Sequence, residues 1–297
     1  MKNTNTTVTS LVCSLTVLAL APLSTKAAIT VNGSYDPAFG SALAVQTANT
    51  GFGSGPASSG GNQLDAAYGT VQGGNLYLFF AGNTSDGNFL DLFIADGRAG
   101  QSTFNVSSGG TIAMNGSVFS PGFSATFSVN ANTFAGTMYP NAYDLVANVG
   151  GYTGAGLPDS GGTIAGAPAG NGVQLAVNNS SPAGSGVNTG AGALTVTTGW
   201  EVAIPLSLLG NPSGSIEVLA DINGNPDNYL SNQFLPGLPD GTGNLGAGGP
   251  YSGPATGAFD FGSTPGEYFT VPQVPEPSTF ALLIGGLASL LWLRGRH

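Results

Sequence analysis

The chain has 297 residues and a formal net charge of −10 at pH 7, because 5 Lys and Arg stand against 15 Asp and Glu. It contains 49 Gly and 19 Pro, too many helix-disfavouring residues for a helical protein. Hydrophobic residues make up 41% and charged residues 7%, so the chain has enough apolar surface to form a packed β-rich core. The scarcity of Lys and Arg excludes nucleic acid as a partner, because phosphate binding needs clustered cations.

The N-terminal segment has the three parts of a secretory signal peptide. Lys2 precedes a polar stretch, an apolar run covers 11–23, and the segment 24–28 places small residues at the cleavage site. We predict a signal peptide over 1–27 with cleavage after Ala27. The alternative is a retained membrane anchor, which is less favoured because the apolar run is shorter than the ~20 residues that span a bilayer.

The C-terminal segment, 271–297, carries a second apolar run. Its motif is Pro275-Glu276-Pro277, followed by an apolar run over 280–293 and a tip containing Arg294 and Arg296. As a helix the run would rise ~21 Å, less than the ~30 Å hydrocarbon core of a membrane. The two arginines predict a cytoplasmic end.

This order of motif, short apolar helix and basic tip resembles the PEP-CTERM sorting signal of exported bacterial proteins. The resemblance covers 275–297 and implies recognition by an exosortase, a membrane enzyme thought to cut at the motif. It also implies a Gram-negative bacterium that makes extracellular polysaccharide. We therefore expect export to the cell envelope, outer surface or extracellular matrix, with transient or permanent membrane anchoring through 280–293. The resemblance gives no activity to 28–274.

Processing at both ends would leave a chain with few of the residue types that commonly catalyse reactions. Without 1–27 and the residues after Pro277, Arg98 is the remaining cation beside 15 acids, a net charge of −14. His, Cys and Lys are then absent, which excludes histidine triads, thiol nucleophiles, Schiff bases, disulfides and His- or Cys-based zinc sites. Carboxylate catalysis and an oxygen-bound metal, most simply calcium, remain.

The region 28–270 is predicted to be one all-β domain, an antiparallel β-sandwich with a jelly-roll-like arrangement. Apolar runs at 75–81 and 89–95 bracket a Gly/Asn/Asp turn and predict a hairpin. Residues 205–210 predict a short helical turn with a Gly cap. Further strands are expected at 123–129, 133–139, 143–149, 173–177, 194–204 and 216–222.

The segments 199–210 and 216–222 resemble the second half of carbohydrate-binding module family nine and related DOMON-like sandwiches. There, a strand ending in E-x-x-I-P turns through a short helical segment into a second strand. Asp65 to Tyr68, followed by 76–80, is similar to their early strand pair. The resemblance implies a jelly-roll-like sandwich and sugar binding. The paired binding tryptophans of that family have no counterpart here, and Trp200 is interpreted as a core residue.

A candidate calcium loop follows the strand predicted at 216–222. Asp221, Asn223, Asn225 and Asp227 place oxygen side chains at positions 1, 3, 5 and 7, a spacing that lets alternate residues face one hard cation. The loop departs from the EF-hand, which needs Gly at position 6 and Glu at position 12. The alternative is a polar turn. A second acidic group, Asp86, Asp91 and Asp96 with Arg98, is interpreted as ordinary surface.

For carboxylate catalysis the candidates are Glu201 and Glu217, expected on neighbouring strands, from which they could be brought to the ~5–9 Å separation of glycosidase pairs. Tyr229, Phe234 and Tyr251 are candidate sugar-site aromatics, although most sandwich aromatics are core residues. The favoured hypothesis is a non-catalytic, structural or adhesive envelope protein that binds extracellular polysaccharide. The alternatives are a carboxylate-dependent glycan hydrolase or lyase, and a calcium-stabilised surface protein without a sugar ligand.

Overall fold

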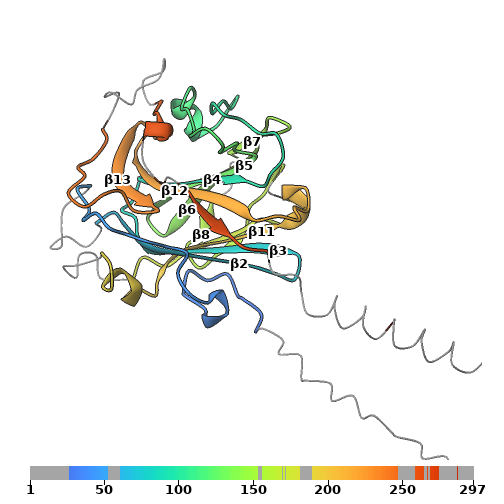
Figure 1. The fold of residues 1–297 in the computed structure, drawn as a ribbon, viewed down its shortest axis with the longest axis horizontal. Helices are drawn as coiled ribbons and strands as arrows, with labels where there is room; N and C mark the ends of the chain where they lie inside the picture. Colours follow the sequence, from blue (N-terminus) through green and yellow to red (C-terminus); the bar gives the residue numbers. More distant parts are fainter. Residues whose placement is uncertain are drawn as a thin grey trace, which may run out of the picture. The chain divides into compact units, whose positions relative to one another are not determined.

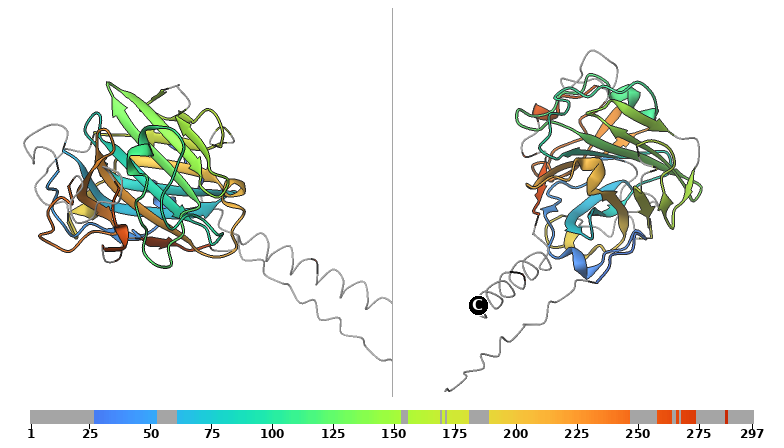
Figure 2. Two further views of the ribbon diagram at one scale, coloured as in Figure 1. Left: turned by 90° about the horizontal axis from the view of Figure 1, so that it is seen from above. Right: turned by 90° about the vertical axis from the view of Figure 1, so that its right-hand side faces the viewer.

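The computed structural model shows two antiparallel β-sheets packed face to face as a β-sandwich (Figures 1 and 2). This confirms the prediction of an all-β antiparallel sandwich. The strands belong to one compact unit, Ala27–Pro275. The structure describes residues 27–52, 61–152, 156–168, 170, 172–180, 189–246, 258–263, 266, 268–273 and 286.

Each sheet mixes strands that are distant in the sequence. The six-stranded sheet has the order β1 (Ala44–Val45), β2 (Gln63–Gln72), β3 (Asn75–Asn83), β11 (Gly199–Pro205), β10 (Gln174–Val177) and β9 (Gly162–Thr163). The eight-stranded sheet runs β13 (Tyr229–Leu235), β12 (Ile216–Gly224), β4 (Phe89–Ala95), β5 (Phe127–Phe134), β6 (Thr137–Asp144) and β7 (Val149–Tyr152). Two short strands complete it: β14 (Phe269–Val271) pairs with β12, and β8 (Leu157–Pro158) pairs with β6.

Short 3-10 helices lie before the first strand and in the connections between later strands. They are η1 (Pro37–Phe39), η2 (Gly110–Met114), η4 (Ala193–Thr195), η5 (Leu206–Leu209) and η6 (Phe261–Ser263). The helical turn predicted at 205–210 is confirmed as η5. It ends at Gly210, whose φ of 71° lies in the left-handed region that glycine adopts without steric cost.

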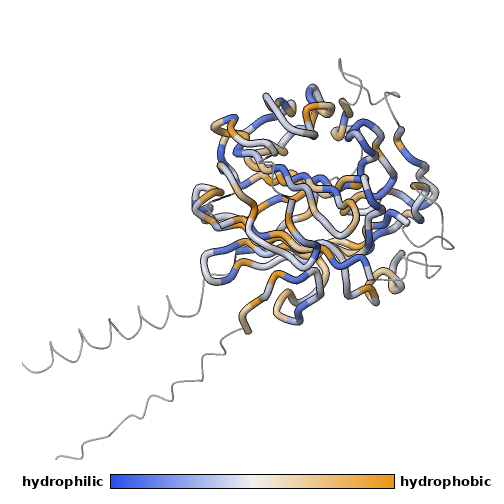
Figure 3. The backbone as a smooth tube through the Cα atoms, turned by 180° about the vertical axis from the view of Figure 1, so that it is seen from behind, coloured by the Kyte–Doolittle hydropathy of each residue, from blue (hydrophilic) through white to orange (hydrophobic). Residues whose placement is uncertain are grey.

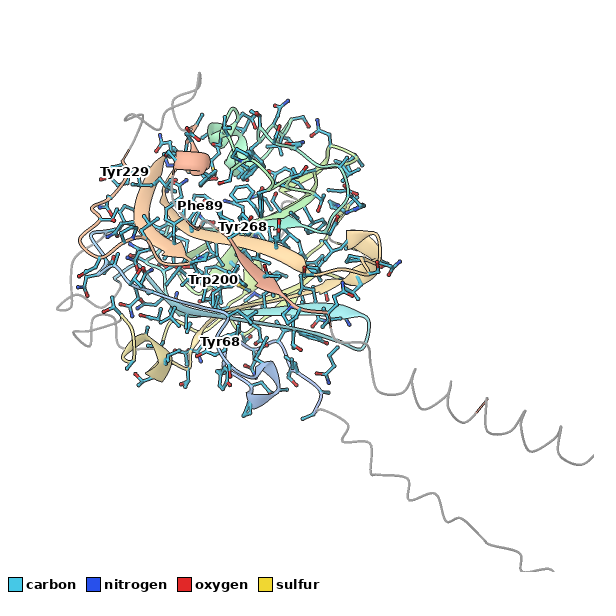
Figure 4. The ribbon with its side chains drawn as sticks, viewed as in Figure 1. Tyr68, Phe89, Trp200, Tyr229 and Tyr268 are labelled. Atoms are coloured by element: carbon cyan, nitrogen blue, oxygen red, sulfur yellow. The ribbon has the colours of Figure 1, made fainter. Side chains whose placement is uncertain are left out.

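The main hydrophobic core fills the space between the sheets. Leu78 and Trp200 reach it from the six-stranded sheet, and Leu92 and Val218 reach it from the eight-stranded sheet. Figure 4 shows Trp200 between the two layers, and Figure 3 shows the mixture of apolar and polar residues along the backbone. The prediction that Trp200 is a core residue is confirmed, because it has 0% exposure and its indole Nε1–H donates to Thr84 Oγ1 at 2.8 Å.

Both outer faces of the sandwich also carry apolar clusters. Outside the six-stranded sheet, Ile29 and Phe39 from the start of the unit cover Tyr68 and Phe79. Outside the eight-stranded sheet, the cover comes from the segments 104–123 and 258–261, which pack on Phe93 and other residues of that face. Polar side chains on the outer faces can therefore be buried as deeply as those of the core.

The predicted hairpin at 75–81 and 89–95 is wrong, although both strands exist. β3 pairs with β2 and β11 in one sheet, whereas β4 pairs with β12 and β5 in the other. The connection after β3 therefore crosses between sheets. The true hairpin partner of β3 is β2, joined through Gly73 and Gly74, which both have positive φ as in the tight turns that match strand twist.

The strand boundaries predicted between 123 and 149 are displaced. β5 begins at Phe127, and the turn to β6 falls at Ala135 and Gly136, inside the strand predicted at 133–139. The segment predicted as 143–149 is mostly the turn before β7. The predictions at 173–177 and 216–222 agree closely with β10 and β12, whereas 194–204 becomes η4 followed by β11.

The terminal segments lie almost entirely outside the described part of the chain. The expected signal peptide falls there except for Ala27, and the apolar run 280–293 falls there except for Gly286. Within the residues that the structure describes, no helix is long and apolar enough to cross a bilayer.

Replacing Trp200 tests the packing between the sheets. We expect Trp200→Ala to lower the free energy of unfolding by ~3–5 kcal/mol, because a fully buried aromatic side chain is replaced by a cavity. Trp200→Phe should cost less, since it keeps an aromatic ring but leaves the Thr84 hydroxyl without its donor. Urea unfolding followed by circular dichroism measures both, and a loss below ~1 kcal/mol for Trp200→Ala would contradict this packing.

Candidate functional site

A row of polar side chains crosses the outer face of the eight-stranded sheet. Strand pairing places Asp91 of β4 directly opposite Asp221 of β12 on one side and Asn130 of β5 on the other. Asn130 is in turn opposite Asn141 of β6. Because direct cross-strand partners share a face, these four side chains form one line across four strands.

The direction of this row follows from the alternation of strand side chains. Leu90 and Leu92, on either side of Asp91, both belong to the core between the sheets. Ala220 and Ile222 flank Asp221 in the same way. Since successive side chains point to opposite faces, the row points away from the core and lies beneath the outer cover.

A third carboxyl group reaches the row from the turn between β12 and β13. Asp227 has a positive φ of 69°, and its Oδ2 accepts a hydrogen bond from Asn130 Nδ2 at 3.1 Å. The same Nδ2 donates to Asp91 Oδ1. We call Asp91, Asp221 and Asp227 the carboxyl cluster. Asn130 is its amide donor, and Asn141 Nδ2 orients that amide by donating to Asn130 Oδ1 at 3.1 Å.

The carboxyl cluster is closed to solvent. All three aspartates have 0% exposure. Burial raises the pKa of each carboxyl above its ordinary value, and contact with Asp91 raises the pKa of Asp221 and Asp227 further. The hydrogen bond from Asn130 lowers the pKa of Asp91 without cancelling the effect of burial.

Several oxygens of the carboxyl cluster have no hydrogen-bond donor. They are both oxygens of Asp221, Oδ2 of Asp91 and Oδ1 of Asp227. An ionised carboxylate only accepts hydrogen bonds, so two carboxylates in contact cannot satisfy each other. Either bound protons or a cation must therefore balance the negative charge of these carboxyl groups.

The structure brings together some, but not all, of the residues of the predicted calcium loop. Asp221 and Asp227 join the carboxyl cluster, and Asn223 is buried on β12, where its Oδ1 accepts from the Tyr229 N–H at 2.8 Å. Asn225 is exposed at the tip of the turn. Within the described residues, no group of three or more His, Cys, Asp or Glu side chains is arranged as a preformed metal site.

Sequence reasoning missed Asp91 and Asn130. The surface interpretation of Asp91 is wrong, because this side chain is fully buried on a central strand. Asp96 is also buried, and its carboxylate pairs with Arg98 at 2.6 Å. Only the cross-strand register brings Asp91 to Asp221, and a single sequence does not show that register.

Glu201 has a structural contact on the opposite side of the sandwich. It lies on β11 between Trp200 and Val202, which both point into the core, so its own side chain faces outward. Its Oε2 accepts hydrogen bonds from the backbone N–H groups of Asn32 at 2.8 Å and Gly33 at 3.0 Å. Burial raises the pKa of Glu201 to about 7, against the lowering effect of these two bonds.

The expectation that Glu201 and Glu217 lie on neighbouring strands is wrong. Glu201 is on β11 of the six-stranded sheet, and Glu217 is on β12 of the eight-stranded sheet. Ile216 and Val218 both enter the core, so Glu217 also points outward. Packed sheets lie ~10 Å apart, and the two carboxyl groups extend in opposite directions from them, beyond the separation of a glycosidase pair.

The candidate sugar-site aromatics have different environments. Phe234 is fully buried beneath the outer cover, and Tyr251 lies outside the described residues. Tyr229 is half-buried and stacks on Phe52, with ring centroids 5.5 Å apart and an interplanar angle of 17°. Figure 4 shows Tyr229 at the periphery of the sandwich, away from Trp200.

The predicted sorting residues, Pro275, Glu276, Pro277, Arg294 and Arg296, lie outside the described residues. Comparisons with protein-family models, curated proteins and solved structures found no match to this chain.

The pKa of Glu201 predicts a pH dependence of stability. An unfolded Glu loses its proton near pH 4.5, whereas the folded one keeps it to about pH 7. Between these values the folded state binds more protons, so the contribution of Glu201 is fully present below pH 4.5 and is lost as the pH rises through 7. Glu201→Gln keeps an acceptor for both backbone N–H groups and removes the titration.

We therefore expect Glu201→Gln to match the wild type at pH 4 and to exceed its stability at pH 8 by up to about 3 kcal/mol. Urea unfolding across this range measures the difference between the two proteins. Asp240→Asn, at an exposed loop position, is the control and should follow the wild type. A Glu201→Gln protein that is less stable at pH 8 would contradict the raised pKa.

Proposed function

We propose that this chain is an exported, non-catalytic protein of the cell envelope or extracellular matrix, with a structural or adhesive role toward extracellular polysaccharide. The proposal of a non-catalytic role is supported by the positions of the Asp and Glu side chains. The three aspartates of the carboxyl cluster and Glu201 are all fully buried. Glu201 and Glu217 lie on opposite sides of the sandwich and do not flank a common substrate position.

The destination is supported by the terminal sequences. A signal-peptide pattern at 1–27, and the Pro275-Glu276-Pro277 motif followed by an apolar run and two arginines, are the parts that an exosortase sorting system would use. We propose membrane anchoring through 280–293 before or after processing. In the same proposal the arginines remain on the cytoplasmic side.

The sugar-binding part is supported by local architecture and surface chemistry. β11, η5 and β12 reproduce the strand, short helix and strand order of the carbohydrate-binding module resemblance. The chain crosses between sheets after β3 and again after β11, which supports a jelly-roll-like arrangement. The stacked Phe52 and Tyr229 lie beside the amide-bearing turn at Asn225, a combination suited to contact with a sugar ring.

Sorting is tested in the producing bacterium. We expect a variant with Ala at Pro275, Glu276 and Pro277 to disappear from the outer surface and accumulate, unprocessed, in the membrane fraction. Immunoblotting of cell fractions measures both position and size. Asp240→Asn is the matched control and should sort normally. Unchanged surface display of the triple variant would contradict sorting through this motif.

Binding is tested by co-sedimentation of the full-length protein with the bacterium's own purified polysaccharide. We expect Tyr229→Ala to weaken binding at least about 5-fold, since truncating an aromatic residue that contributes to an interface costs more than ~1 kcal/mol. Tyr139→Ala, at another half-buried tyrosine of the same sheet, should bind normally. Reducing-sugar release by the wild type that is lost in Glu201→Gln or Glu217→Gln would instead establish an enzyme.

A further inference from the structure

When its three carboxyl groups are ionised, the carboxyl cluster needs a positively charged partner, and residues 27–275 do not supply one. Arg98 is the only Lys or Arg between residues 27 and 275. Its guanidinium is committed to Asp96: Nε donates to Oδ1 at 3.0 Å and Nη2 donates to Oδ2 at 2.6 Å. No other side chain in this range carries a positive charge, because the only His is His297.

Asp221 is the acid of the carboxyl cluster with the fewest partners. Its side chain has 0% exposure, its neighbour across the strand pair is Asp91, and neither of its oxygens has a hydrogen-bond partner. Buried polar groups in folded proteins are nearly always paired, and an unpaired buried carboxylate is among the most costly exceptions. In an ordinary polar turn, the carboxylate oxygens would face water. The turn interpretation therefore does not account for the burial of Asp221.

We infer that Asp91, Asp221 and Asp227 bind a divalent metal ion of the hard, oxygen-preferring class, of which Ca²⁺ is the leading member. The three carboxylates offer up to six oxygens, and Ca²⁺ takes 6 to 8 oxygen ligands in flexible geometry. The set differs from the loop predicted by sequence, because it includes Asp91 from β4 and leaves out Asn223 and Asn225. The inference does not depend on export or on polysaccharide binding.

The surrounding amides act as orienting groups for this site. Asn130 presents Nδ2 to Asp91 and Asp227, since its Oδ1 already accepts from Asn141. Asn223 likewise uses its Oδ1 for the Tyr229 N–H. Hydrogen bonds from such neighbours fix the rotamers of ligating carboxylates and tune the affinity of the site.

Metal binding requires these side chains to rearrange, because within the described residues the three acids do not form a preformed metal position. Asp91 and Asp221 are fixed by the pairing of β4 with β12. Asp227 is the adjustable ligand, since it lies in the turn between β12 and β13, two residues after the exposed Asn225. Bound metal would therefore fasten this turn to the centre of the sheet.

The experiment uses the full-length protein, stripped with EDTA and then supplied with CaCl2, MgCl2 or MnCl2. At a Ca²⁺ concentration ~100-fold above its Kd, we expect the melting temperature to rise by about 5–10 °C. Isothermal titration calorimetry should give one Ca²⁺ per chain. Asp221→Asn and, separately, Asp227→Asn should remove both the shift and the binding, since each replaces a charged ligand with a neutral amide.

Asp65→Asn is the matched control. Asp65 is also fully buried and has one unpartnered oxygen, but it lies on β2 of the other sheet and contacts Gln63 rather than another acid. This variant should keep the full calcium shift. Absence of a shift with all three ions would overturn the inference, and so would a shift that survives in both Asp221→Asn and Asp227→Asn.

Discussion

The pairing of β4 with β12 places Asp91 opposite Asp221 at the centre of the larger sheet. The stability of that sheet depends on how the charge of these two carboxyl groups is balanced. On the opposite face, the same two strands supply Leu92 and Val218 to the main core. The strands cannot separate to relieve the repulsion without opening that core. Like charges opposite each other destabilise a strand pair, and burial increases the penalty. The apolar packing on one face therefore holds the carboxyl groups together on the other.

The outer covers explain how a chain with so few charges buries so many polar groups. In most antiparallel sandwiches the outer faces meet water, and their polar residues are solvated. Here the segments 104–123 and 258–261 enclose the face that carries the carboxyl cluster, while the residues around Ile29 and Phe39 enclose the face that carries Glu201. Glu201 holds its cover directly through two backbone N–H groups. Acids in this fold thus connect layers of the structure that are remote in sequence.

Local signals in the sequence predicted local structure well. The apolar run at 216–222 and the Pro-to-Gly segment at 205–210 became β12 and η5, because strand propensity and a glycine cap act over a few residues. Pairing was not predictable in the same way. Every residue of β4 is buried, so no alternation marked which face would carry Asp91. β13, whose centre is Ser, Asn and Gln, was not predicted, and β2 was indicated only through the family resemblance at Asp65 to Tyr68.

The burial of acids also changes how the outside of the protein interacts with other molecules. The formal charge counts 15 acids, but Asp65, Asp96, Glu201 and the carboxyl cluster are all enclosed. The charge facing solvent is therefore less negative than the sequence suggests, and it is spread over loop positions such as Asp86, Asp240 and Asp260. Contacts made by such a surface depend on amides, hydroxyls and exposed rings more than on ion pairs. In the proposed contact with polysaccharide, these groups would meet sugar hydroxyls, whereas a polyanion such as nucleic acid would find no cluster of Lys and Arg between residues 27 and 275.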